Sequence, residues 1–224
     1  MPPWLTGAYA VPDNYVEAVR RAGGRPVLLL PGERAEPAEL LDLVDALLLV
    51  GGGDVEPARY GGDGGPTIYG VEPDRDALEV DLLRTAAERS IPTLAVCRGI
   101  QVMNVAFGGT LIPNLPDEPG MLVHGSPTEV AVRHTVKTAP DGLLAAVTDV
   151  DVLECASHHH QALAELGDGV VACGWSEDGL VEAIERGEGW MLGVQWHPEE
   201  TAGTDPAQQR LFDTLVEQAT GRRA

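Results

Sequence analysis

The sequence predicts an α/β fold, a three-layer sandwich in which helices cover both faces of a mostly parallel β-sheet. Short apolar runs alternate with helical patterns through the first half of the chain, as a parallel sheet requires. Two of these runs, at 46–50 and 93–96, read as strands buried on both faces. The chain has 224 residues, 44% of them hydrophobic, which suits one domain spanning residues 1–224.

The individual elements follow from hydrophobic periodicity and from the glycines and prolines between periodic segments. Helices are expected at 15–21, 37–44, 75–89, 100–107 and 206–219. Strands are expected at 25–30, 46–50, 93–96, 129–136, 151–155, 170–175, 180–185 and 190–196. Asp178-Gly179 is a hairpin-turn signal, and the segments 56–74 and 110–125 are expected to be irregular.

Charge and cysteine content limit the classes of partner and compartment. The formal net charge is −20, from 35 acidic and 15 basic residues, so nucleic acid and anionic membrane surfaces would repel the chain. We expect neither as a partner. The sequence contains no apolar run of transmembrane length and no secretory signal pattern. Three cysteines are a small, odd set, which fits reduced thiols and a cytoplasmic protein.

Cys97 stands at the turn from the strand 93–96 into the following helix. A helix N-terminus carries partial positive charge and favours a thiolate, and a sharp strand-to-helix turn holds a nucleophile clear of the sheet. Ala95 occupies a position that is usually glycine in such turns. The alternative is a buried structural cysteine. The residues around Cys97 and its partners later in the chain favour the nucleophile.

Two further strands also end in suggestive residues. The strand 46–50 leads into Gly51-Gly52-Gly53, either a flexible loop or a place where backbone N–H groups approach a ligand. The strand 190–196 leads into His197-Pro-Glu199, either a surface loop or a base held by a carboxylate. Because parallel strands end at one edge of a sheet, we expect Cys97, the glycine loop and His197 to border one cleft.

Three adjacent histidines, His158, His159 and His160, suggest a metal site at first sight. Neighbouring residues in a strand point to opposite faces, so at most two of these rings could converge. No carboxylate or cysteine pair stands beside them at the spacing of zinc ligands. We therefore expect no metal and no cofactor, and interpret the run as pocket lining whose ring N–H groups face a polar substrate.

Four ordered motifs carry a resemblance to a known family. They are the runs 48–57, 94–104, 157–161 and 193–199. With them the chain resembles class I glutamine amidotransferase-like proteins, and most of all γ-glutamyl-γ-aminobutyrate hydrolases of the peptidase C26 type, from about Tyr15 onward. The resemblance implies a flavodoxin-like class I glutamine amidotransferase fold, a γ-glutamyl substrate, a thioester mechanism and a place in polyamine or putrescine catabolism.

The resemblance also implies the roles of individual residues. Cys97, His197 and Glu199 would form a catalytic triad, and the backbone N–H groups of Gly52 and Arg98 would hold the oxyanion. Gln101, Ser157 and His159 would contact the substrate.

Two features depart from the family pattern. The family's opening strand is not recognisable at the start of this chain, so we expect a sheet with one strand fewer, or a strand supplied by a partner or an upstream segment. Ala156 stands where the family has asparagine, which concerns the detailed substrate. A glutaminase subunit serving a separate synthase, and a non-catalytic binding protein, remain alternative functions, and a homodimer remains open.

Overall fold

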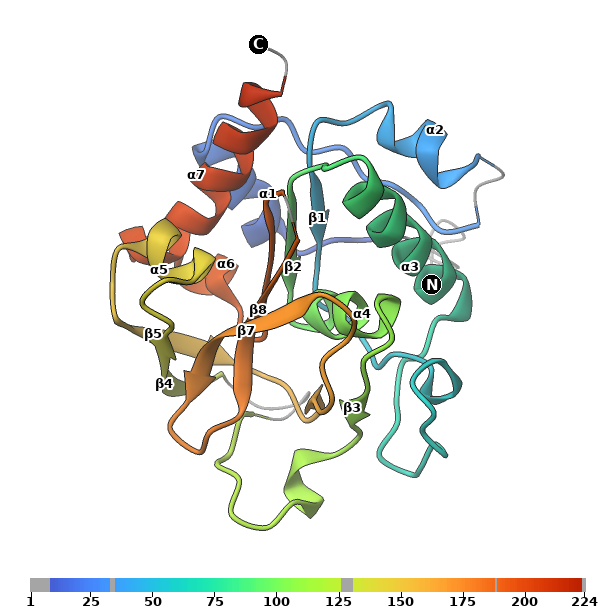
Figure 1. Cartoon of the computed structure of the whole chain (residues 1–224), viewed down its shortest axis with the longest axis vertical. Helices are drawn as coiled ribbons and strands as arrows, with labels where there is room; N and C mark the ends of the chain where they lie inside the picture. The colour runs from blue at the N-terminus through green and yellow to red at the C-terminus, as the bar shows by residue number, and fades with distance from the viewer. Residues whose placement is uncertain (1–8, 33–34, 126–130, 188, 223–224) are drawn as a thin grey trace, which may run out of the picture.

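The computed structural model describes residues 9–32, 35–125, 131–187 and 189–222, and the described chain has the expected α/β architecture (Figure 1). Its main sheet contains seven strands in the order β1-β2-β9-β8-β7-β4-β5. Their bounds are β1 Leu47–Leu49, β2 Thr93–Val96, β4 Val132–Thr138, β5 Val152–Ser157, β7 Val170–Ser176, β8 Val181–Arg186 and β9 Met191–Val194. The strands β1, β2 and β9 are parallel, whereas β8, β7, β4 and β5 follow as antiparallel neighbours. A small antiparallel sheet pairs β3 (Leu111–Ile112) with β6 (Ala162–Leu163).

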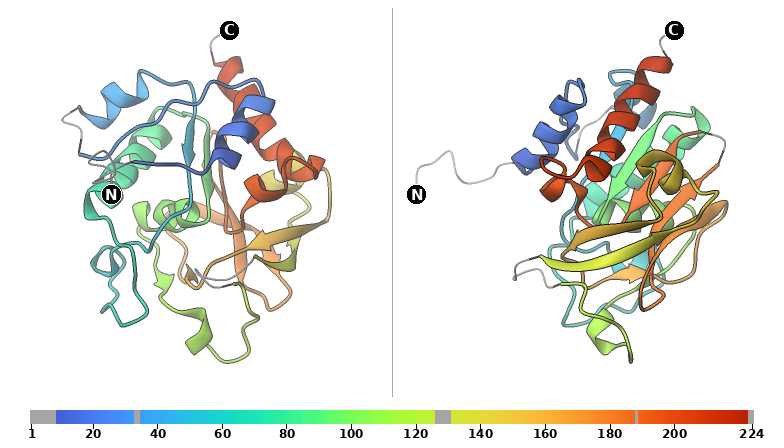
Figure 2. Two further views of the ribbon diagram at one scale, coloured as in Figure 1. Left: turned by 180° about the vertical axis from the view of Figure 1, so that it is seen from behind. Right: turned by 90° about the vertical axis from the view of Figure 1, so that its left-hand side faces the viewer.

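Helices lie on both faces of the main sheet and complete three layers. One face carries α1 (Asp13–Arg21), α5 (Leu143–Thr148) and α7 (Pro206–Gly221), and the other carries α2 (Pro37–Leu41), α3 (Pro73–Glu88) and α4 (Arg98–Ala106). Alternate residues of β2 feed the two cores: Leu94 and Val96 pack with the first group of helices, and Ala95 packs with the second. The views in Figure 2 show α1 beside α7 on one side of the sheet.

Most predicted elements match observed ones, with boundary shifts of a few residues. The helix predicted at 37–44 is shorter, ending at Leu41, and the strand predicted at 190–196 is limited to β9. The predicted hairpin around Asp178-Gly179 forms as β7 and β8, and Asp151–Cys155 falls mostly within β5. The helix α5 and the pair β3–β6 are elements that the sequence did not indicate.

The strand predicted at 25–30 is wrong. This segment pairs with no strand among the described residues, and Val27 and Leu28 are 62% and 52% exposed. The apolar run suggested a doubly buried strand, but β1 is the edge of the main sheet on this side and only β2 pairs with it. Residues 1–8, where the family's opening strand was sought, lie outside the described residues, as do positions 129 and 130 of another predicted strand.

The parallel strands bring their carboxyl ends to one edge. The register aligns Val96, the residue before Cys97, with Val194 of β9, and Ala95 with Leu49 of β1. The glycine loop, Cys97 and the segment leading to His197 therefore leave the sheet side by side. None of the helices in the described part of the chain has the length and apolar content that crossing a bilayer requires.

Candidate active site

Cys97 occupies a sharp turn between β2 and α4. Its φ and ψ are 54° and −108°, a strained conformation for a residue with a side chain. The turn is held because the Cys97 N–H donates to the Val194 carbonyl at 2.8 Å and because α4 packs closely on β1. A methyl group at Gly99 would lie 2.8 Å from the Leu49 carbonyl oxygen, so only glycine permits this approach. The thiol thus sits at the N-terminus of a buried nine-residue helix.

His197 and Glu199 form a hydrogen-bonded pair beside this thiol. The His197 Nδ1 and the Glu199 Oε1 are 2.6 Å apart, and the side chain of Glu199 is 3% exposed. Burial acts to lower the pKa of His197, but the charge and hydrogen bond of Cys97, together with those of Glu199, outweigh it and raise that pKa to about 11. The Cys97 thiol and the Glu199 carboxylate thus both favour the protonated imidazole.

The glycine loop packs against the same group. A methyl group at Gly51 would lie 3.1 Å from Cε1 of His197 and 3.7 Å from Cβ of Cys97. The Gly51 N–H donates to the Tyr15 hydroxyl at 3.1 Å. The Gly52 N–H has no acceptor among the described residues. Arg98 is the first residue of α4, and first-turn N–H groups have no partner within their helix. The Gly52 N–H thus has no acceptor among the described residues, and the Arg98 N–H has none within its helix.

A buried ion-pair network fixes the strand ends from the α3 side. The guanidinium of Arg98, 2% exposed, pairs with Asp76 and Glu79 of α3. Arg75 pairs with Glu79 at 2.7 Å and donates to the carbonyls of Val50 and Gly51 at 3.1 and 3.0 Å. One network thus ties the residue after Cys97 to the glycine loop.

Sequence reasoning missed both this network and the hydroxyl of Tyr15. The available signal was weak, because the acidic residues of α3 resemble a solvent-facing helix stripe and Tyr15 reads as a packed apolar position. A methyl group at Gly51 would lie 3.3 Å from the Tyr15 hydroxyl and 3.1 Å from Cε1 of His197, which places this hydroxyl near the candidate pair. Burial, the charge of Glu199 and the charge of Cys97 raise the pKa of Tyr15 well above its usual range.

The predicted substrate contacts lie in different surroundings. The Gln101 Nε2 donates to the Gln161 carbonyl at 3.2 Å and to Gln195 Oε1 at 3.3 Å. The hydroxyl of Ser157 is buried without a partner among the described residues. The ring of His159 is 2% exposed, and its Nε2 lies 3.4 Å from the Glu182 carboxylate. These surroundings favour a different role for His159.

The three adjacent histidines have three different sets of partners, and no two of their rings share one. The ring of His158 hydrogen-bonds to Glu200 and meets the ring of His197 edge-on, with centroids 5.1 Å apart. The Nε2 of His160 lies 2.9 Å from the Asp54 carboxylate. Only His158 therefore borders the Cys97–His197 pair directly.

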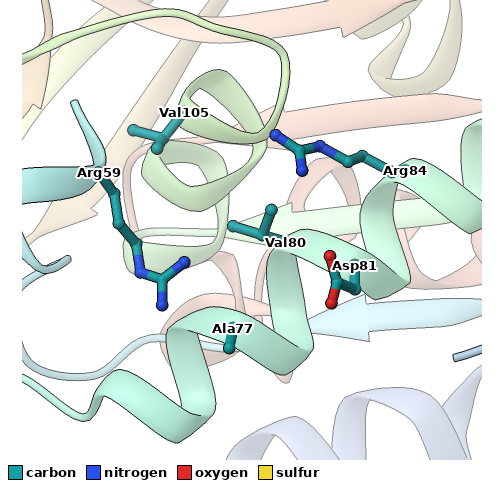
Figure 3. A pocket seen from close by; sticks show the side chains of 6 residues that line it. All are labelled: Arg59, Ala77, Val80, Asp81, Arg84 and Val105. Atoms are coloured by element: carbon teal, nitrogen blue, oxygen red, sulfur yellow. The ribbon is translucent and has the colours of Figure 1, made fainter. Parts of the chain in front are cut away.

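A surface cavity lies beside α3, with Arg59 and Val105 also in its lining (Figure 3). It has a volume of about 230 Å³ and lies along α3 and α4, with lining residues Arg59, Ala77, Val80, Asp81, Arg84 and Val105. None of the candidate catalytic residues lines it, and the Arg84 Nε is already bonded to the Ala106 carbonyl at 2.9 Å. The candidate catalytic residues therefore lie at the strand ends, outside this cavity.

Comparison with known proteins identifies the family. The family model described as peptidase C26 matches residues 3–199. The chain belongs to the peptidase C26 family. The family resemblance inferred from the motifs is thereby confirmed.

Two relatives extend this assignment of the peptidase C26 chain. One is a Mycobacterium tuberculosis protein whose name describes it as a glutamine amidotransferase. It is 40% identical over 222 aligned residues, which cover 97% of this chain and 70% of that protein. The other is the γ-glutamyl-γ-aminobutyrate hydrolase PuuD of Escherichia coli, 34% identical over 220 residues, 91% of this chain and 84% of that protein. The family and these relatives support a γ-glutamyl hydrolase or amidotransferase-like activity. The peptidase C26 match and the hydrolase relative favour a hydrolase.

A solved structure supports the fold of the peptidase C26 chain. A Thermoplasma acidophilum protein, described as a GMP synthase subunit, superimposes with a TM-score of 0.67 at 16% identity, covering 94% of this chain and 88% of that chain. At this identity the similarity concerns the fold alone, and the glutamine amidotransferase-like fold is thereby confirmed.

Proposed function

We propose that this chain hydrolyses γ-glutamyl amide bonds through a thioester on Cys97. One observation supports this above all: the His197 Nδ1 lies 2.6 Å from the Glu199 carboxylate, and the ring of His197 and the Cβ of Cys97 lie 3.1 and 3.7 Å from the same point, a methyl group placed at Gly51. A base oriented by a carboxylate next to a thiol is the arrangement that nucleophilic catalysis by cysteine requires. The elbow geometry of Cys97 also leaves its sulfur at the end of the parallel strands.

The proposed reaction has two steps. The Cys97 thiolate attacks the δ-carbonyl carbon of the glutamyl group, and the carbonyl oxygen becomes an oxyanion facing the N–H groups of Gly52 and Arg98. The C–N bond breaks as protonated His197 gives its proton to the leaving amine, which yields the thioester. His197 then takes a proton from water, hydroxide adds to the thioester carbonyl, and the thiolate leaves with release of glutamate.

Substrate binding is assigned to the residues around this centre. The free hydroxyl of Ser157 is a buried donor without a partner among the described residues, as expected of a group reserved for a ligand. Gln101 lies on α4, one turn beyond Cys97, and would approach the glutamyl moiety. We propose γ-glutamyl-γ-aminobutyrate or a related γ-glutamyl amine as substrate, because a 34% identical relative carries that activity in its name.

A panel of γ-glutamyl amides tests the proposal. Purified protein without any partner is given γ-glutamyl-γ-aminobutyrate, other γ-glutamyl amines and glutamine, and released glutamate is measured. We expect γ-glutamyl amines to be cleaved with higher kcat/KM than glutamine. Activity on glutamine that appears only with an added synthase would favour a glutaminase subunit, and no turnover of any amide would favour a binding protein. Cys97→Ala, with unchanged circular dichroism, is expected to abolish every activity.

A further inference from the structure

Four buried side chains outside the candidate active site form one cluster. They are His124, in the loop before β4, His134 of β4, His159, just after β5, and Glu182 of β8. Their side chains are between 0% and 5% exposed. One ligand-type atom from each residue lies within 4.8 Å of all the others. The strands β4 and β8, which contribute His134 and Glu182, and β5, which His159 follows, belong to the antiparallel part of the sheet (Figure 1).

Each imidazole in the cluster uses one ring nitrogen on an acceptor outside it. The His124 Nε2 lies 2.9 Å from the Asp178 carboxylate, the His159 Nδ1 lies 2.9 Å from the Gln161 carbonyl, and the His134 Nδ1 lies 3.3 Å from the Thr135 carbonyl. A carboxylate or carbonyl that accepts one ring N–H fixes the tautomer, so that the other nitrogen carries a lone pair. In each ring that other nitrogen points into the cluster.

The inward-facing atoms approach one another but form no hydrogen bond among the described residues. The His124 Nδ1, the His134 Nε2, the His159 Nε2 and both carboxylate oxygens of Glu182 are buried without a hydrogen bond among the described residues. The Glu182 Oε1 lies 3.2 Å from the His124 Nδ1 and 3.4 Å from the His159 Nε2, but neither contact has hydrogen-bond geometry. Unpartnered polar atoms at this depth are costly and indicate a missing ligand.

Two of the distances between these atoms match a four-coordinate metal ion, and all four atoms lie within 4.8 Å of one another. Metal–ligand bonds of about 2.0–2.1 Å in a tetrahedron hold the ligand atoms roughly 3.3–3.4 Å apart. The two Glu182 contacts with His124 and His159 are within about 0.2 Å of this distance. His134, with its Nε2 at 3.9 Å from Glu182 Oε2, needs a small inward shift. Three imidazoles and one carboxylate suit zinc among the common divalent ions.

We propose that His124, His134, His159 and Glu182 bind one divalent metal ion of the zinc class. With four protein ligands the coordination shell is closed, so the ion is structural. It joins the loop at 121–125 to β4, to β8 and to the segment after β5. It also fixes His159, whose neighbour His158 faces the candidate catalytic histidine. The site is independent of the proposed hydrolysis, and its ligands include no residue of the Cys97–His197–Glu199 group.

The proposed site differs from the expectation of no metal. That expectation considered His158, His159 and His160 as a unit with nearby ligands. Only His159 joins the cluster, and its three partners come from distant parts of the chain.

The competing explanation is an ion-pair network without metal. Burial acts to raise the pKa of Glu182, but His159, His124 and His134 outweigh it and lower that pKa to about 2. In this case a proton on a neighbouring imidazole would balance the carboxylate, and chelators would have no effect on the protein.

Metal analysis of the full chain separates the two. Protein produced with zinc, then dialysed against metal-free buffer, is examined by elemental mass spectrometry for all first-row metals. We expect about one equivalent of metal per chain, and at least tenfold less in His134→Gln and Glu182→Gln. His158→Gln is the matched control: it removes an adjacent imidazole that does not face the cluster, and its metal content should equal that of the wild type.

A cycle on the wild-type protein keeps the test valid if the variants fail to fold. Removal of the metal with a strong chelator should lower Tm by about 5–11 °C relative to protein at a metal concentration 100-fold above Kd, and added Zn²⁺ should restore it. Co²⁺ should give the intense visible absorption of a four-coordinate site.

Asp178, which binds the His124 Nε2 from outside the cluster, allows a test with a smaller expected effect. Asp178→Asn should keep the metal but weaken its binding about 10–100-fold in competition with a chromogenic chelator. The proposal would be overturned if wild-type protein holds no metal after zinc loading and its Tm changes with neither chelator nor Zn²⁺. Equal metal loss from the His158→Gln control would also overturn it.

Discussion

Glu199→Gln is the perturbation that isolates the role of the carboxylate from that of the imidazole. Glu199 is 4% exposed, and its Oε1 lies 2.6 Å from the His197 Nδ1. Glutamine keeps the size and the position but loses the charge, and its amide can present an N–H where the imidazole needs an acceptor. The wrong tautomer would then be favoured, with Nδ1 as acceptor and with an N–H directed at the thiol.

The expected fall in kcat is scaled from the equivalent change in a serine triad. In a serine triad the equivalent change lowers kcat by about 10⁴-fold. A thiol loses its proton more readily than a hydroxyl, so we expect a fall of about 10²–10⁴-fold here, or roughly 3–5 kcal/mol in the barrier. KM should change little, because Glu199 is assigned no contact with the substrate.

The assay is steady-state release of glutamate from a γ-glutamyl amide, with Glu200→Gln as the matched control. Glu200 is the adjacent glutamate, its side chain is 31% exposed, and it hydrogen-bonds to His158 instead of His197. We expect the control to lose less than about tenfold in kcat, since its contact with the triad is indirect. Equal losses in the two variants, or an unchanged kcat in Glu199→Gln with an intact fold, would refute the assigned role of Glu199.

Two further predictions concern the same centre. Gly52→Ala places a methyl group 2.3 Å from the Arg75 Nη1, and displacement of the oxyanion donor should lower kcat by about 10²–10³-fold. The control Gly65→Ala has no atom within 4 Å of its added methyl group and should leave kcat unchanged, so equal kcat values in the two variants would count against the oxyanion assignment. The pKa of His197, about 11 in the wild type, should fall in Cys97→Ala, as followed by NMR titration of the imidazole. Because that pKa is raised above 6.5, protonated His197 contributes stability that is complete below about pH 6.5 and lost as the pH rises toward 11, so the free energy of unfolding should decline more over this range in the wild type than in Cys97→Ala.

Sequence patterns predicted the parallel half of the molecule well, because strong local signals mark it. The apolar runs before Gly51, Cys97 and His197 end at the same sheet edge, and the parallel register aligns them. The failure at 25–30 has a physical cause as well. An apolar run is compatible with a strand, but pairing depends on a neighbour that the run itself does not specify.

The parts that sequence reasoning missed depend on contacts between distant segments. Asp76 and Glu79 belong to an amphipathic helix, and nothing local shows that they are buried against Arg98. Glu182 alternates within an ordinary hairpin strand, yet three histidines from other segments surround it. Ion-pair networks and metal sites of this kind become visible only when the chain is folded.

The most direct test of the account is a search for the covalent intermediate. Protein mixed with a γ-glutamyl amide is quenched in acid within a single turnover, digested, and analysed by mass spectrometry. We expect a glutamyl adduct on the peptide that contains Cys97, absent from Cys97→Ala and released by hydroxylamine as a thioester is. Glutamate release at the wild-type rate without an adduct at any time, or unchanged turnover in Cys97→Ala, would contradict the account.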